Sequence, residues 1–146
     1  MPITAEERTY LKNKHKGGKN NSKGAAYESF YATYKIALLI DRYIKQLDDV
    51  RLTSQLENCF VDDLLIVEPD AHRTYHQLKD VKDLTWNTKK LRYDFKRQKD
   101  ISSEVDENFE LKLVHSNSTT MVIPFRMKSS LVPLLYSFQP RRALIN

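Results

Sequence analysis

Two short segments of the sequence carry side chains that a metal-dependent phosphodiesterase needs. Asp63 stands directly before a four-residue apolar run, and Gln77 and Lys79 stand two residues apart in a later segment rich in β-forming residues. Mg²⁺ takes oxygen ligands and keeps several waters, so one or two carboxylates and a carbonyl oxygen suffice to hold it. A lysine beside the metal can orient the attacking water and stabilise the negative charge that develops at phosphorus. The pattern therefore predicts a site suited to phosphodiester hydrolysis.

The spacing of Gln77 and Lys79 has two explanations. Side chains at positions i and i+2 of a strand leave the same face, and Leu78 between them points to the opposite face. In one explanation the polar pair is the solvated side of an edge strand. In the other it belongs to a site that also contains Asp63. The spacing alone leaves both explanations open.

The elements that would position these residues follow from apolar periodicity. Over residues 25–48 the apolar side chains recur at three- and four-residue steps, which predicts a long helix with one wide buried face. Five further elements are expected, namely a strand hairpin formed by 60–67 and 73–79, a basic helix at 87–99, and two strands at 109–114 and 119–125. This order predicts an α/β or α+β domain with a mixed sheet.

The chain divides into three expected parts. Residues 1–23 show no apolar periodicity and hold two of the three glycines, so they are expected to form a flexible basic arm. Residues 24–128 form the predicted folded domain, in keeping with a length of 146 residues. Residues 129–146 are apolar for a chain end, and we interpret this tail as a docking segment or as the point where a longer protein has been cut short.

Positive charge is segregated along the chain, whose net charge is +5. Residues 1–23 contain six basic side chains against two acidic ones, and residues 71–100 contain nine against four. Such segregation favours a polyanionic partner, although a basic solvated surface explains it too. Trp86 and Tyr93 lie within the second basic region, where they could contact a nucleic-acid backbone or be buried. The residues expected to bind nucleic acid are Lys14, Lys16, Lys19, Lys23, Lys89, Lys90 and Arg92.

Several motifs follow one another in an order that is more specific than any one of them. They are Lys-Gly-Gly-Lys-Asn-Asn-Ser-Lys-Gly at 16–24, Ala-Tyr-Glu-Ser-Phe at 26–30, Asp-Asp-Leu-Leu-Ile-Val at 62–67 and Tyr-His-Gln-Leu-Lys at 75–79. Together they resemble the PD-(D/E)XK nuclease superfamily, in the variant that reads Asp…Gln-x-Lys. More narrowly, the chain looks like the nuclease domains of bacterial anti-phage effectors of the CBASS and Lamassu kinds.

This resemblance implies an α/β, restriction-endonuclease-like fold with a mixed central sheet flanked by helices and a long first helix. It also assigns roles to residues. Asp63 would be the principal metal ligand and Gln77 the second. Lys79 would orient water, and Glu28 would be a helix-borne acid that also binds the metal. Asp62 is the rival of Asp63, which is preferred because family members place the acid directly before the apolar run. Glu28 has a structural explanation as well, since a glutamate in the first turn stabilises the helix dipole.

The expected function is therefore a Mg²⁺- or Mn²⁺-dependent endonuclease that cleaves double-stranded DNA as the effector of an anti-phage defence system. Homo-oligomers or partner subunits such as an SMC-like ATPase are implied by the resemblance. The alternatives are a catalytically inactive nucleic-acid-binding module of the same fold, and a non-enzymatic interaction subunit of a larger complex. We expect a cytoplasmic protein without a membrane partner, because the sequence has a single cysteine, Cys59, and shows no visible targeting or membrane segment.

Overall fold

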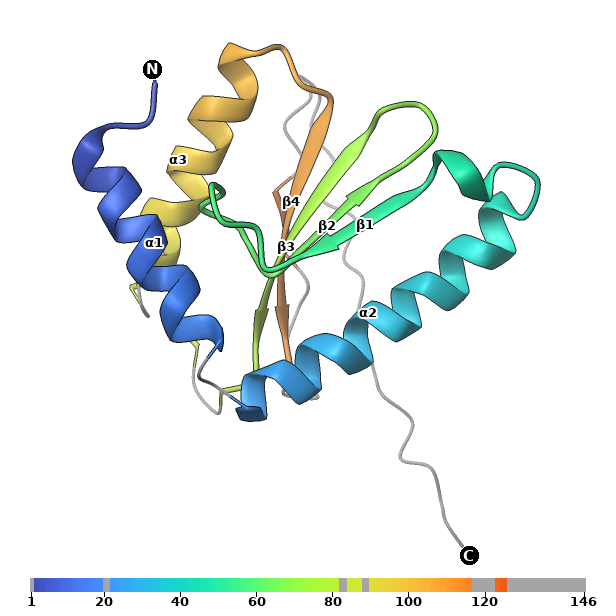
Figure 1. The fold of residues 1–146 in the computed structure, drawn as a ribbon, viewed down its shortest axis with the longest axis horizontal. Coiled ribbons are helices and arrows are strands. Elements are labelled where there is room, and N and C mark those ends of the chain that lie inside the picture. The colour runs from blue at the N-terminus through green and yellow to red at the C-terminus, as the bar shows by residue number, and fades with distance from the viewer. Residues whose placement is uncertain (1, 20–21, 82–83, 88–89, 117–122, 126–146) are drawn as a thin grey trace, which may run out of the picture.

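A computed structural model describes residues 2–19, 22–81, 84–87, 90–116 and 123–125. Its elements are α1 (Ala5–Lys19), α2 (Ser22–Tyr43), a 3₁₀ turn at Leu47–Asp49, β1 (Arg51–Ser54), β2 (Leu64–Val67), β3 (Arg73–Lys79), α3 (Leu91–Glu104), β4 (Phe109–His115) and β5 (Ile123–Phe125). The described strands form one five-stranded sheet in the order β1-β2-β3-β4-β5. Helix α2 runs along one side of the sheet, and α1 and α3 lie side by side on the other (Figure 1). The predicted α/β class is confirmed.

The sheet is mixed, because its strands pair in both directions. β1, β2 and β3 form an antiparallel meander in which Leu64 lies opposite His76. β4 then pairs with β3 in parallel, with Gln77 opposite Leu113, and α3 makes the crossover that a parallel pair needs. β3 is therefore the central strand, and the explanation of Gln77 and Lys79 as the solvated side of an edge strand is wrong.

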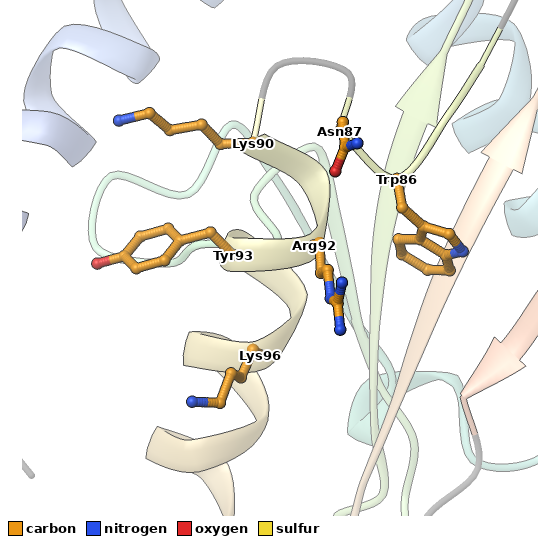
Figure 2. A pocket seen from close by; sticks show the side chains of 6 residues that line it. All are labelled: Trp86, Asn87, Lys90, Arg92, Tyr93 and Lys96. Atoms are coloured by element: carbon orange, nitrogen blue, oxygen red, sulfur yellow. The ribbon is translucent and has the colours of Figure 1, made fainter.

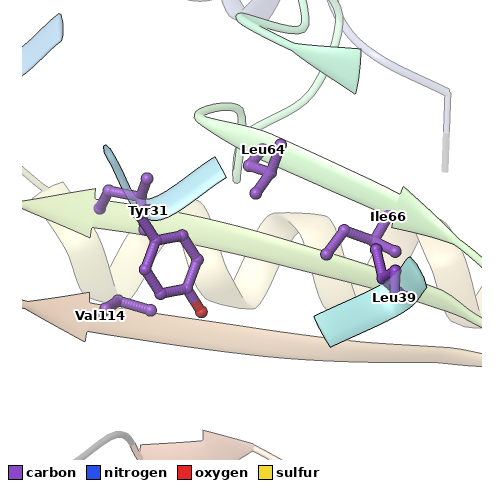
Figure 3. Packing of buried hydrophobic residues seen from close by; sticks show 6 residues of the cluster. Tyr31, Leu39, Leu64, Ile66 and Val114 are labelled. Atoms are coloured by element: carbon purple, nitrogen blue, oxygen red, sulfur yellow. The ribbon is translucent and has the colours of Figure 1, made fainter. Parts of the chain in front are cut away.

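One apolar cluster joins the sheet to α2. Tyr31 and Leu39 of the helix pack on Leu64 and Ile66 of β2 and on Val114 of β4 (Figure 3). The helix residues lie eight positions apart, which returns them to neighbouring parts of one helix face. This contact places the first turns of α2 over the ends of β3 and β4.

A second cluster covers the opposite face of the sheet. Leu91 and Phe95 of α3 pack against Tyr75 of β3 and against Leu111 and Leu113 of β4. Because both faces of the central strands are covered, β2 has a continuous apolar sequence instead of an alternating one. The two clusters together fix the position of β3, which carries Gln77 and Lys79.

Helix α1 occupies most of the segment that was expected to be a flexible arm over residues 1–23, so that expectation is wrong for the described part. The helix begins with a capping box, in which the Thr4 N–H donates to Glu7 Oε2 (2.9 Å) and the Glu7 N–H donates to Thr4 Oγ1 (3.2 Å). The Glu7 carboxylate also accepts a hydrogen bond from Arg97 Nη2 (2.9 Å) on α3. Leu11 is buried beneath the helix. The sequence of α1 shows little apolar periodicity because the helix is stabilised by a capping box and buries one leucine. Apolar periodicity therefore did not predict it.

The other predicted elements differ from the structure mainly at their ends. The long helix ends at Tyr43 instead of near 48, the first hairpin strand is confined to Leu64–Val67, and the basic helix begins at Leu91. The strand expected at 119–125 is described at Ile123–Phe125, and the apolar tail at 129–146 lies outside the described residues. None of the described helices is long and apolar enough to cross a membrane.

Candidate active site

The Asp63 carboxylate is the point where the predicted residues meet. Its Oδ2 accepts hydrogen bonds from Gln77 Nε2 and from the Leu78 N–H (2.6 Å), and lies 3.6 Å from Lys79 Nζ. The register of β2 on β3 explains this placement, since Leu64 lies opposite His76 and the preceding residue therefore lies beside the end of β3. The structure brings Asp63, Gln77 and Lys79 together as the sequence analysis expected.

Burial makes the charge on Asp63 costly. Burial raises the pKa of this carboxyl, and the nearby Asp62 raises it further. The ammonium of Lys79, the Leu78 N–H and the ammonium of Lys14 act in the opposite direction, but the pKa stays above its ordinary value. An additional cation beside Asp63 would therefore stabilise the ionised form.

Glu28 approaches the same place from α2. Its Oε2 accepts a hydrogen bond from Gln55 Nε2 (2.5 Å). Burial and the charge of Asp63 raise the pKa of Glu28 from 4.5 to about 7, and Lys79 lowers it only in part. Sequence analysis missed Gln55, which has a left-handed backbone (φ 55°) and donates its N–H to the carbonyl oxygen of Asp63 (3.3 Å). No signal in the sequence identifies it.

Lys14 is turned into the protein, whereas it was expected to bind nucleic acid from a flexible arm. Its ammonium donates to Asp94 Oδ2 (3.0 Å), Gln77 Oε1 (3.2 Å) and the carbonyl oxygen of Phe60, and it forms an ion pair with Asp62 Oδ1 (2.9 Å). Burial alone would lower the pKa of Lys14, but the two carboxylates outweigh it and raise that pKa. In this position the ammonium is not presented to a ligand outside the protein.

The contacts of Lys14 change the expected role of Gln77. The Gln77 side chain is fully buried, its Nε2 donates to Asp63, and its Oε1 accepts from Lys14. The amide oxygen that was expected to bind a metal therefore faces Lys14 instead of Asp63. In this arrangement Gln77 holds the Asp63 carboxylate in place. The two neighbouring acids are also distinguished, because Asp63 contacts Gln77 and Lys79 while Asp62 contacts Lys14.

Asp94 of α3 was assigned no role from the sequence. It is 1% exposed, and its Oδ1 accepts a hydrogen bond from the Tyr10 hydroxyl (2.9 Å). Its position offers a signal that could have identified it, because Leu91, Phe95 and Gln98 define a stripe of buried residues on α3 and Asp94 falls within that stripe. A carboxylate on the buried face of a helix requires a partner, which Lys14 and Tyr10 provide.

The carboxylates that could hold a divalent ion near Lys79 are Asp63 and Glu28. Within the described ranges, no three side chains of histidine, cysteine, aspartate or glutamate are grouped so as to hold a metal ion. A Mg²⁺ ion here would have two protein carboxylates, with water or a DNA phosphate completing an octahedral shell. The raised pKa values of both carboxyls fit such a site, because a cation would relieve the repulsion between them.

The predicted basic surface is only partly described. Lys16, Lys90 and Arg92 are exposed, whereas Lys89 and the side chains of Lys19 and Lys23 lie outside the description. A shallow hollow of about 400 Å³ is lined by Trp86, Asn87, Lys90, Arg92, Tyr93 and Lys96. Figure 2 shows Lys90, Tyr93 and Lys96 on one side of α3 and Arg92 on the side of Trp86. This hollow carries four basic or amide side chains beside two aromatic rings, a composition suited to phosphate groups.

Comparison of the chain with known protein families, with curated proteins and with solved structures finds no match. The functional interpretation therefore depends on the geometry of the site and on the resemblance of its motifs to those of the PD-(D/E)XK nucleases.

Proposed function

We propose that this chain is a restriction-endonuclease-like domain of the PD-(D/E)XK type that hydrolyses double-stranded DNA with Mg²⁺ or Mn²⁺. The observation that carries the proposal is the meeting of Asp63, which directly precedes β2, with Gln77 and Lys79 of β3; Lys79 Nζ lies 3.6 Å from the Asp63 carboxylate. The mixed sheet between helices and the long helix that carries Glu28 also agree with it.

In this proposal each side chain has a role set by its contacts. Asp63 and Glu28 would hold the divalent ion, which when bound polarises the phosphate and lowers the pKa of water. Lys79 orients the attacking water and stabilises the negative charge that develops on the phosphate oxygens. Gln77 and the Leu78 N–H donate to Asp63 and keep its carboxylate in one orientation. Gln77 is thus a positioning residue.

DNA binding is assigned to exposed basic side chains on the two helices that cover one side of the sheet. Lys90 and Arg92 line the hollow on α3, and Lys16 is exposed on α1. Helix α3 is tied to the site through Asp94, whose carboxylate binds Lys14. Contacts of these side chains with phosphates would position the duplex without reading its sequence.

A second copy of the chain is the proposed partner. Cleavage of both strands by a fold with one site needs two copies, and α2 offers an apolar surface for their association. Six large side chains along this helix and at its end are between 38% and 67% exposed: Phe30, Tyr34, Ile36, Leu38, Ile40 and Ile44. Several exposed large apolar side chains on one helix favour an interaction surface there. In sedimentation, the wild type should be a dimer and the Ile40→Asp variant a monomer. A monomeric wild type at micromolar concentration would contradict the proposed dimer. The exposed surface of α2 would then be assigned to a partner subunit such as an SMC-like ATPase.

An inactive nucleic-acid-binding module is kept as the second candidate because of one observation. The Gln77 Oε1 atom, which was expected to bind a metal, accepts a hydrogen bond from Lys14 instead. This candidate predicts that the protein binds DNA and leaves it intact with either ion. A role as effector of an anti-phage system is proposed on the resemblance of the motifs alone.

Cleavage of supercoiled plasmid tests the proposed function. With Mg²⁺ or Mn²⁺ the wild type should produce nicked and linear DNA, and Asp63→Asn and Lys79→Met should each lower the rate by a factor on the order of 10² or more while DNA binding is retained. Asp70→Asn and Lys45→Met are matched controls, because both residues are exposed and neither belongs to the proposed metal site or DNA surface. Equal background cleavage by the wild type and Asp63→Asn would overturn the proposal.

A further inference from the structure

The ammonium of Lys14 lies in a shell of oxygen atoms of the kind that metal ions occupy. The shell consists of one oxygen each from Asp62, Asp94, Gln77 and the carbonyl group of Phe60. An ammonium has three hydrogens, so four oxygen neighbours exceed the number of hydrogen bonds it can donate at full strength. Carboxylate, amide and carbonyl oxygens are also the ligands that hard divalent cations prefer.

The shell of Lys14 adjoins the Asp63 site directly. Gln77 belongs to both, since its Oε1 accepts from Lys14 and its Nε2 donates to Asp63. Asp62 and Asp63 are consecutive, and each faces one of the two ammonium groups, Lys14 and Lys79. Two cation positions therefore stand side by side, and a lysine fills one of them.

The charges around this pair of positions do not balance. Among the described residues, the ammonium groups of Lys14 and Lys79 act on four carboxyls here, those of Glu28, Asp62, Asp63 and Asp94. With all four carboxyls ionised, two negative charges remain. A single divalent ion between Asp63 and Glu28 would neutralise them, whereas two divalent ions would leave an excess of positive charge.

We infer that Lys14 is a resident cation that takes the place of a second metal ion, so that the site binds a single divalent ion beside Asp63. This inference rests on the proposed function for the first ion. It assigns α1 a part in the site, because the helix delivers the second positive charge. If Lys14 is removed, the oxygen shell is left with two buried carboxylates and becomes a binding site for a divalent cation.

A simple anchoring role for Lys14 makes a different prediction. An ion pair that only holds α1 against α3 would be lost on substitution, with a loss of stability that metal does not reverse. Breaking a buried pair by removing one partner is strongly destabilising. Recovery of stability by a divalent cation is therefore the property that separates a resident cation from an anchor.

The test compares Mn²⁺ binding and thermal unfolding of the full chain, wild type and Lys14→Ala. Lys14→Ala should bind one more Mn²⁺ per chain than the wild type, counted by electron paramagnetic resonance, and Mn²⁺ should raise its unfolding midpoint more than it raises that of the wild type. Lys14→Ala combined with Asp94→Asn should lose the additional ion. Lys16→Ala, an exposed lysine on the same helix, is the control and should bind as the wild type does.

Each outcome decides the inference. If Lys14→Ala is unfolded without metal, millimolar Mn²⁺ should restore its circular dichroism spectrum, and failure to do so overturns the inference. An equal number of ions bound by wild type and Lys14→Ala, or two ions bound by the wild type, also overturns it. A wild type that binds none while Lys14→Ala binds one would contradict the proposed nuclease and support the resident cation.

Discussion

Substitution of Glu28 by glutamine should change how the stability of the protein depends on pH. The pKa of Glu28 is raised from 4.5 to about 7, chiefly by burial and next by Asp63. A carboxyl with a raised pKa in the folded state holds its proton more tightly than it does in the unfolded chain. The free energy of unfolding should therefore decrease as the pH rises from 4.5 to about 7 and should receive no further contribution from Glu28 above that.

The size of this effect follows from the shift and from the exposure of the side chain. A rise from 4.5 to about 7 corresponds to about 3 kcal/mol at full weight, and we expect roughly 1–2 kcal/mol because Glu28 is only half-buried. A glutamine side chain cannot ionise, so the Glu28→Gln variant should gain this amount relative to the wild type as the pH rises from 4.5 to about 7. Mg²⁺ should stabilise the wild type at about pH 8 more than it stabilises the variant.

Urea unfolding followed by circular dichroism at several pH values measures the difference. At each pH the free energy of unfolding of the variant is compared with that of the wild type, and the change of this difference with pH is the relevant quantity. The absolute difference is not used, because the substitution also alters the contact with Gln55 at every pH. Glu6→Gln is the control, because Glu6 is an exposed glutamate in the first turn of α1. Parallel stability curves for Glu28→Gln and the wild type would refute the placement of Glu28 beside Asp63.

Four further substitutions test the fold and the proposed DNA surface. Leu39→Ala should lower the free energy of unfolding by about 2–4 kcal/mol in urea, because Leu39 is buried against β2; a loss below about 1 kcal/mol would contradict that packing. Thr4→Ala should cost about 1 kcal/mol by removing the capping box, and an unchanged unfolding midpoint would show that α1 does not depend on it. Lys90→Ala and Arg92→Ala should each reduce the slope of log affinity for duplex DNA against log salt by about one, measured by fluorescence anisotropy, whereas Lys45→Ala should leave the slope unchanged.

The sequence predicted the parts of the fold that depend on apolar periodicity and strand register. The long helix was found because its buried face contains large apolar residues such as Tyr31 and Leu39. The meeting of Asp63 with Gln77 and Lys79 could be expected because a hairpin places the start of one strand beside the end of the next. These inferences use residues close in sequence, whose relative positions one local element decides.

The contacts of α1 could not be predicted in this way. Lys14 reaches Asp94, which is 80 residues away, and the two meet only once α1 and α3 have packed side by side. A lysine in a basic, glycine-containing segment is expected to face solvent, so its burial depends on partners that the local sequence does not reveal. The orientation of the Gln77 amide has the same origin, because Lys14 accounts for the position of its oxygen.

Localised oxidative cleavage of the protein by bound Fe²⁺ tests the central claim most directly. Fe²⁺ that replaces Mg²⁺ produces hydroxyl radicals with ascorbate and peroxide, and these radicals cut the polypeptide near the ion. We predict cuts close to residue 63 and within 77–79 in the wild type, suppressed by excess Mg²⁺ and abolished by Asp63→Asn. Cuts that persist in Asp63→Asn, or that fall away from both strands, would contradict a metal site at Asp63.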